Sequence, residues 1–137
     1  MKYYLDTAIW RDYYENRSDN LRPLGEWALE LLRMIKENRE TVLYSDLVVH
    51  ELSKDFGKEK IEEIFKIIAN ERLLEKIEPT DEQIKEAIKI SKILNIPSAD
   101  CLHTIMARDS SAVMITRDVH FEQLRFIADI KKPEELI

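Results

Sequence analysis

Short apolar runs alternate along the chain with longer segments whose apolar residues recur at the spacing of a helix. This alternation constrains the fold strongly, because strands separated by helices pair in parallel through right-handed crossovers. Both faces of such a sheet must then be covered by helices. The pattern therefore predicts an α/β protein with a mainly parallel five-stranded sheet, whose strands we expect at residues 3–5, 41–44, 73–77, 112–115 and 126–130.

Helical segments fill the connections between these strands. We expect them at residues 8–15, 21–36, 45–54, 61–68, 80–94, 97–110 and 118–124. The spacing predicts buried positions at Leu24, Ala28, Leu31, Leu32 and Ile35 in the second segment and at Ile84, Ala87, Ile88 and Ser91 in the fifth. A chain of 137 residues is long enough for one sizeable core, so we expect a single domain over residues 1–137.

Composition limits the classes of function. A formal net charge of −6 disfavours nucleic-acid binding, unless several acids are held on metal ions that supply local positive charge. The single cysteine, Cys101, excludes an internal disulfide and fits a reducing compartment. No apolar run is long enough to span a membrane, and the N-terminus lacks a secretory layout. We therefore expect a cytoplasmic protein with no membrane contact.

Four acids follow strands or lie in the early turns of the helices after them. Asp6 ends the first strand and Asp118 follows the fourth, while Glu51 and Asp100 lie early in their helices. Ligands of open parallel sheets bind at the carboxyl ends of the strands, where the crossovers diverge. If the first and fourth strands are neighbours, we expect these acids to meet at one edge of the sheet.

Clustered carboxylates repel one another at neutral pH, and a hard divalent cation such as Mg²⁺ or Mn²⁺ relieves the repulsion. Such a site activates water and neutralises charge on a phosphodiester. In this hypothesis Asp6, Asp100 and Asp118 are metal ligands. Glu51 is a further ligand or holds the attacking water. The chemistry is that of a metal-dependent RNA phosphodiesterase.

Two neighbours of these acids are candidates for substrate binding. Thr7 follows Asp6 and can hydrogen-bond a ligand oxygen or the scissile phosphate. Arg117 precedes Asp118 and carries a positive charge that suits a phosphate.

Each acid considered alone also has a structural explanation. Asp118 fits an N-cap, Asp100 fits the positive end of a helix, and Glu51 fits a solvated helix position. Asp6, directly after an apolar strand, is the hardest of the four to explain this way. The metal hypothesis therefore depends on the four acids acting together.

Four motifs together resemble the PIN domain family, and within it the VapC-type toxin ribonucleases. They are YLDTAIW at residues 4–10, SDLVVHEL at 45–52, SADCLHTIMA at 98–107 and ITRDVHF at 115–121. Their order and spacing fit across essentially the whole chain. No single motif is specific, so the resemblance rests on the ordered set.

The resemblance implies a three-layer α/β/α sandwich and a metal-dependent ribonuclease that cuts single strands. It also implies a homodimer neutralised by a partner antitoxin. By motif position Asp6, Glu51, Asp100 and Asp118 match the family's acidic quartet. The small polar residues that accompany the quartet are matched by Thr7 and Thr116, and the buried aromatic after the last acid is matched by Phe121.

The remaining histidines and aromatic residues have simpler interpretations. His103 lies three residues after Asp100 and could bind a softer metal, although we favour local packing. His50 and Cys101 are expected to be structural, and His120 has no partner evident in the sequence. Three aromatic residues of the first helix, Trp10, Tyr13 and Tyr14, could stack on bases but fit packing equally well.

Three alternatives remain open. A phosphoaspartyl transferase would use Asp6 as nucleophile, but the position two residues later, where such enzymes place a second aspartate, is Ala8. In a non-catalytic interaction module, the mutual repulsion of the four carboxylates would lower stability without serving a function. A PIN nuclease could also act in RNA processing without being a toxin.

Overall fold

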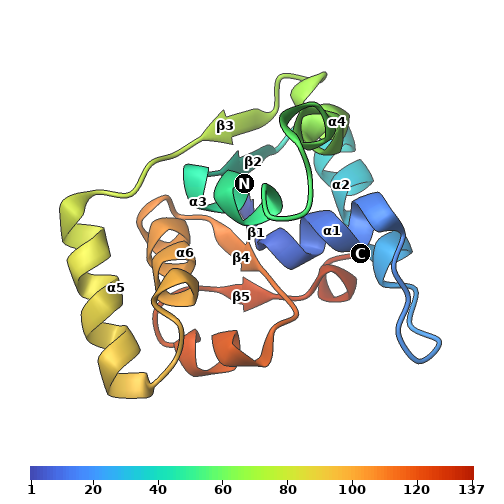
Figure 1. The fold of residues 1–137 in the computed structure, drawn as a ribbon. Coiled ribbons are helices and arrows are strands. Elements are labelled where there is room, and N and C mark those ends of the chain that lie inside the picture. Colours follow the sequence, from blue (N-terminus) through green and yellow to red (C-terminus); the bar gives the residue numbers. More distant parts are fainter.

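The computed structural model describes residues 1–137 and contains a five-stranded sheet in the order β3-β2-β1-β4-β5 (Figure 1). Every neighbouring pair is parallel. The strands are β1 (Lys2–Leu5), β2 (Thr41–Tyr44), β3 (Leu74–Lys76), β4 (Val113–Ile115) and β5 (Ile130–Lys131). The first and fourth strands are neighbours, which is the condition under which the acids are expected to meet: β1 pairs with β4 through Tyr3–Val113, Tyr4–Met114 and Leu5–Ile115.

Helices cover both faces of this sheet, as expected for a three-layer α/β/α sandwich. They are α1 (Thr7–Glu15), α2 (Leu24–Glu37), α3 (Asp46–Leu52), α4 (Lys58–Ala69), α5 (Asp81–Leu94) and α6 (Ser98–Asp109), with short 3₁₀ turns η1 (Val119–Leu124) and η2 (Pro133–Glu135). The chain moves outward from β1 to β3 and then crosses back to β4. Right-handed crossovers therefore place α1 and α2 opposite α5 and α6 (Figure 1).

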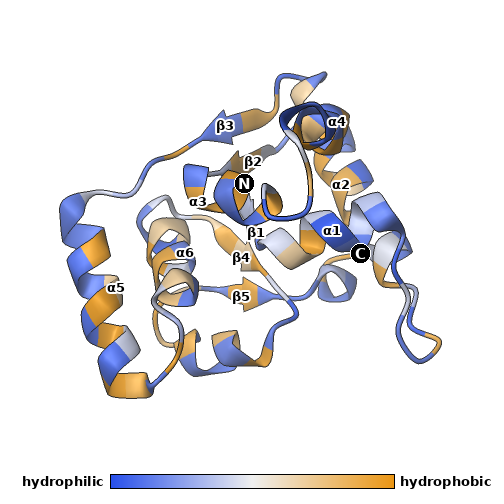
Figure 2. Cartoon of the chain, viewed as in Figure 1, coloured by the Kyte–Doolittle hydropathy of each residue, from blue (hydrophilic) through white to orange (hydrophobic).

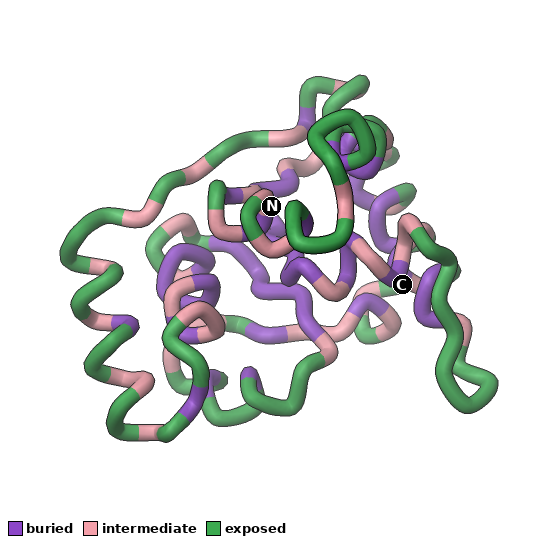
Figure 3. The backbone as a smooth tube through the Cα atoms, in the orientation of Figure 1, coloured by how far each residue is buried: buried purple, intermediate pink, exposed green.

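The core lies between the sheet and the inward helix faces, where the buried backbone gathers in Figure 3. The central strand β1 is buried over Tyr3, Tyr4 and Leu5. The predicted stripe of α2 is confirmed, because Leu24, Ala28, Leu31, Leu32 and Ile35 are all buried. Phe121 is 1% exposed, in agreement with its expected core position.

Two sequence predictions about elements are wrong in detail. The fifth strand is only Ile130–Lys131, because the preceding segment turns through η1 and leaves Phe126 73% exposed. The seam of α5 includes Ala87 but leaves Ile84 and Ile88 partly exposed, and Figure 2 shows hydrophobic residues spread along this helix. In both cases apolar residues that suggested burial face solvent in the single chain. No helix here combines the length and apolarity needed to cross a bilayer.

Replacement of Gly25 by alanine should weaken the packing of α1 on α2. A Cβ atom at residue 25 would lie 2.5 Å from Asn16 Cα and 2.6 Å from the Asp12 carbonyl oxygen, so backbone must move. We expect Gly25→Ala to lower the free energy of unfolding by about 1–3 kcal/mol in urea denaturation. Gly57→Ala is the control, because no atom lies within 4 Å of its Cβ position. Equal losses in the two variants would contradict this explanation.

Candidate active site

Asp6, Glu51, Asp100 and Asp118 line one pocket of about 220 Å³ at the carboxyl end of the sheet. Asp6 directly follows β1, and its backbone N–H donates to the Ile115 carbonyl at 2.9 Å, which fixes it beside the end of β4. Asp118 follows β4 after two residues. Glu51 is presented by α3 and Asp100 by the first turn of α6. The pocket therefore joins acids that are far apart in the sequence.

Asp6 is the most deeply buried of these acids, at 8% exposure. Its Oδ2 accepts a hydrogen bond of 2.9 Å from the Thr116 hydroxyl. Burial raises the pKa of Asp6 to about 6, although His103 and the Thr116 hydrogen bond act in the opposite direction. The ionised carboxylate of Asp6 is thus poorly compensated by the protein alone.

Asp100 and Asp118 meet at the more open side of the pocket. Burial raises the pKa of Asp100, and the negative charge of Asp118 raises it further. His120 lies between them, with Nδ1 3.2 Å from Asp100 Oδ2 and 3.5 Å from Asp118 Oδ1. No partner for His120 was evident in the sequence. The one sequence feature that could have indicated this contact is that His120 lies two residues after Asp118, an acid that caps a turn. Asp118 Oδ1 accepts the His120 backbone N–H at 2.9 Å.

Glu51 is held by a chain of hydrogen bonds that reaches into the core. Its Oε1 is 2.6 Å from His103 Nε2 and accepts a bond of 3.0 Å from the Thr7 hydroxyl. His103 Nδ1 lies 2.7 Å from the Tyr4 hydroxyl, which is in turn 2.7 Å from Ser45 Oγ. Burial would raise the pKa of Glu51, but its bonds to His103 and Thr7 lower it below the ordinary value. Glu51 is therefore favoured as a carboxylate.

His103 is packed and hydrogen-bonded, as favoured over metal binding, but its partners are not local. His103 is fully buried and contacts β1 and α3 rather than only its own helix. Both of its ring nitrogens are already engaged, which leaves neither free for the softer metal considered with Asp100. His50, the histidine next to Glu51 on α3, is exposed.

The three candidates for substrate binding have protein partners instead. Thr7 donates to Glu51, and Thr116 donates to Asp6. Arg117 points away from the acidic pocket: it pairs with Glu134 at 2.7 Å and stacks over Trp27 with 5.5 Å to the ring centroid. In this structure the hydroxyls of Thr7 and Thr116 orient two of the acids, and Arg117 anchors η2.

Two basic residues that the sequence analysis did not select line the acidic pocket, namely Arg11 and Lys54. Arg11 pairs with Asp55 at 2.9 Å and donates to the Glu51 carbonyl at 2.8 Å. Lys54 is exposed. Arg11 lies in α1, five residues after Asp6, and Lys54 follows the end of α3, three residues after Glu51. Both positions carry positive charge to the edge of the site.

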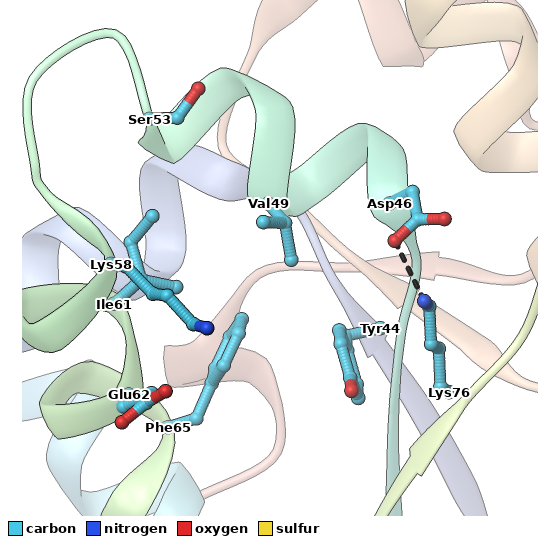
Figure 4. Close-up of a pocket in the computed structure, with 9 residues that line it drawn as sticks. All are labelled: Tyr44, Asp46, Val49, Ser53, Lys58, Ile61, Glu62, Phe65 and Lys76. Atoms are coloured by element: carbon cyan, nitrogen blue, oxygen red, sulfur yellow. Dashed lines mark ion pairs between the residues drawn. The ribbon is translucent and has the colours of Figure 1, made fainter.

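A second pocket, of about 410 Å³, lies on the other side of α3 (Figure 4). Tyr44, Val49 and Phe65 give it an apolar wall, and Asp46 pairs with Lys76 at its edge at 2.8 Å. None of the four acids lines it. The predicted site is therefore the smaller acidic pocket, and this larger pocket is separate from it.

The aromatic residues of α1 pack against the protein. Trp10 is fully buried and meets Phe65 edge-on with centroids 4.8 Å apart. Tyr14 bonds Glu63 at 2.9 Å and meets Phe56 edge-on. Cys101 is fully buried. These contacts support the packing interpretation over base stacking.

The residues of the acidic pocket fit a hard divalent cation. The donors that face it are carboxylate oxygens, which Mg²⁺ and Mn²⁺ prefer. The raised pKa values of Asp6 and Asp100 show that the ionised acids lack sufficient compensation from the protein. A bound cation would supply that compensation.

Removal of the Tyr4 hydroxyl should destabilise the protein more than removal of the Tyr3 hydroxyl. Tyr4→Phe leaves Ser45 Oγ and His103 Nδ1 without their buried partner. The Tyr3 hydroxyl makes only long bonds, of 3.3–3.4 Å to Glu40 and 3.3 Å to Met1 Sδ. We expect a loss of roughly 1–3 kcal/mol for Tyr4→Phe and under about 1 kcal/mol for Tyr3→Phe in urea unfolding. Indistinguishable losses would show that the buried chain contributes nothing specific.

Asp6→Asn should stabilise the metal-free protein at neutral pH. The pKa of Asp6 is raised in the folded state. Its contribution to the free energy of unfolding is therefore fully present below pH 3.8 and is lost as the pH rises through about 6. The difference between the folded and unfolded pKa of Asp6 corresponds to a loss of up to about 3 kcal/mol in the free energy of unfolding at pH 7.5. Urea unfolding in EDTA should show the advantage of Asp6→Asn growing between pH 4 and pH 7. An advantage that does not change with pH would refute this account of Asp6.

Comparisons with known proteins agree with this fold. The family model described as PIN domain matches residues 3–127. Among curated proteins no sequence matches the chain. VapBC2 from Rickettsia felis, bound to a promoter DNA fragment, has a similar structure, with a TM-score of 0.68 at 21% identity over 96% of this chain and 98% of that chain.

Two further solved structures are similar. A toxin-antitoxin complex from Klebsiella pneumoniae gives a TM-score of 0.66 at 14% identity, covering 96% of this chain and 97% of that one. FitAcB from Neisseria gonorrhoeae gives 0.62 at 21% identity, covering 98% and 99%. At these identities the likeness concerns the fold. With the family match over most of its length, the chain belongs to the PIN domain family, whose members are generally nucleases.

Proposed function

We propose that this protein is a Mg²⁺- or Mn²⁺-dependent endoribonuclease that hydrolyses phosphodiester bonds of single-stranded RNA. The observation that carries the proposal is the convergence of Asp6, Glu51, Asp100 and Asp118 on one pocket at the carboxyl ends of β1 and β4. Membership of a family of nucleases supports the same chemistry.

The acids divide into two roles in this proposal. Asp6, Asp100 and Asp118 hold the metal, and Glu51, kept ionised by its hydrogen bonds, holds a further metal position or orients the attacking water. When bound, the metal lowers the pKa of water and neutralises charge on the phosphodiester. Thr116 fixes one oxygen of Asp6 and leaves the other for the pocket. Thr7 and His103 hold Glu51 in place.

Substrate phosphates are bound by Arg11 and Lys54 in this scheme. Both residues line the acidic pocket and place positive charge where the RNA backbone would pass. Arg117 does not line this pocket and pairs with Glu134, so the scheme gives it no phosphate contact. The preference for single strands is what the resemblance to the VapC-type ribonucleases implies.

We further propose that the nuclease is the toxin of a toxin-antitoxin pair and acts as a homodimer with a protein antitoxin as partner. Similar structures of VapBC2, of the Klebsiella complex and of FitAcB support the toxin role. The exposed side chains of Ile84, Ile88 and Ile93 on α5 supply apolar surface for self-association.

Asp6→Asn should abolish RNA cleavage while the protein remains folded. The substitution removes one negative charge from the proposed metal site and keeps the acceptor for Thr116. We expect wild-type protein to cut single-stranded RNA with Mn²⁺ and to stop in EDTA, with a loss of activity of at least about a hundredfold in the variant. Asp129→Asn, an exposed acid before β5 at the opposite end of the sheet, is the matched control.

The same pair of variants tests the toxin role in cells. Induced wild-type protein and Asp129→Asn should arrest growth, and Asp6→Asn should not. Cleavage that persists in Asp6→Asn or in EDTA refutes the metal-dependent nuclease. Cleavage in vitro without growth arrest would favour a PIN nuclease of RNA processing over a toxin.

A further inference from the structure

His120 places an imidazole nitrogen beside two of the acids that line the acidic pocket. Its Nδ1 lies 3.2 Å from Asp100 Oδ2 and 3.5 Å from Asp118 Oδ1. One donor atom from each of these three residues lies within 4.8 Å of the other two. Asp6 and Glu51 are outside this closer group, so the tightest set of possible ligands in the pocket contains nitrogen.

The spacing suits coordination of one ion. An octahedral ion with ligands at roughly 2.0–2.1 Å places adjacent ligands about 3 Å apart. The two distances from His120 Nδ1 are near that value, so small rotations would bring the donors to a common centre. The side chains of Asp100, Asp118 and His120 are 16%, 40% and 46% exposed, which leaves room for the waters such an ion retains.

The local backbone holds His120 in this position. Its N–H donates to Asp118 Oδ1 at 2.9 Å, which closes the first turn of η1. The Asp118 N–H in turn bonds the Thr116 hydroxyl at 3.2 Å, and that hydroxyl also donates to Asp6. The backbone of Asp118 and His120 is therefore linked to Asp6 through Thr116, and the ring of His120 contacts Asp100 and Asp118.

We propose that His120 is a metal ligand together with Asp100 and Asp118, and that it makes this centre favour transition-metal ions such as Mn²⁺ and Co²⁺ over Mg²⁺. Imidazole binds first-row transition metals well, whereas Mg²⁺ prefers oxygen ligands. The inference rests on the proposed function, because it assumes that the acidic pocket holds a divalent ion.

A different role for His120 makes a different prediction. A protonated His120 would act as a counter-ion that pairs with Asp100 and Asp118 in the absence of metal and is displaced when the ion binds. Mn²⁺ would then be bound by oxygen alone. The two roles differ in whether nitrogen is bonded to the metal.

The test is pulsed EPR of Mn²⁺ bound to the full-length protein. A directly coordinated imidazole gives ¹⁴N modulation of the Mn²⁺ echo. The chain has three histidines, and His103 is buried with both nitrogens engaged, so few sources of this signal exist. We expect ¹⁴N modulation in the wild type, its loss in His120→Gln, and its retention in His50→Gln, an exposed histidine on α3 that serves as the control.

Affinity measurements provide a second readout. His120→Gln should weaken Mn²⁺ binding by about tenfold and Mg²⁺ binding by clearly less, so that the Mn²⁺/Mg²⁺ preference falls. Bound Mn²⁺ without ¹⁴N modulation, or modulation unchanged in His120→Gln, overturns this inference and leaves the proposed nuclease intact. Absence of any Mn²⁺ binding by the wild type overturns both.

Discussion

The structure depends on the placement of β1 at the centre of a parallel sheet. This strand pairs with β2 on one side and β4 on the other, so its backbone is satisfied on both edges and its side chains are buried. The ladder continues one residue past the strand, where the Asp6 N–H bonds Ile115. Because the crossovers to either side run on opposite faces, the space beyond β1 and β4 is left open for a site.

A layer of buried polar groups connects this central strand to the acids. Tyr4 is part of β1, yet its hydroxyl reaches His103 and Ser45, and His103 holds Glu51. Thr116 similarly joins Asp6 to the turn that carries Asp118. Buried polar groups are costly unless they are paired, so each member fixes the next. The acids are thus held in position against their mutual repulsion, which a bound cation would relieve.

Sequence reasoning located the acids and the threonines beside them, but not the contacts of the histidines. Asp6, Glu51, Asp100 and Asp118 could be selected because they follow strands in a regular α/β order. His103 of α6 contacts Glu51 of α3, and His120 of η1 contacts Asp100 of α6. Hydrophobic periodicity within one segment cannot predict contacts between different elements. Arg117 shows the converse, since its position beside Asp118 suggested phosphate binding, whereas its side chain turns toward Glu134 and Trp27.

The sequence by itself determined the α/β class, the parallel sheet, the buried stripe of α2 and the acids at the strand ends, because hydrophobic periodicity and strand–helix order are local properties of the chain. Only the tertiary structure decided which side chains face one another: His120 with Asp100, His103 with Glu51 and Tyr4, and Arg117 with Glu134. Side-chain direction depends on crossover hand, strand register and helix rotation. These are set when the whole core packs and not by any one segment.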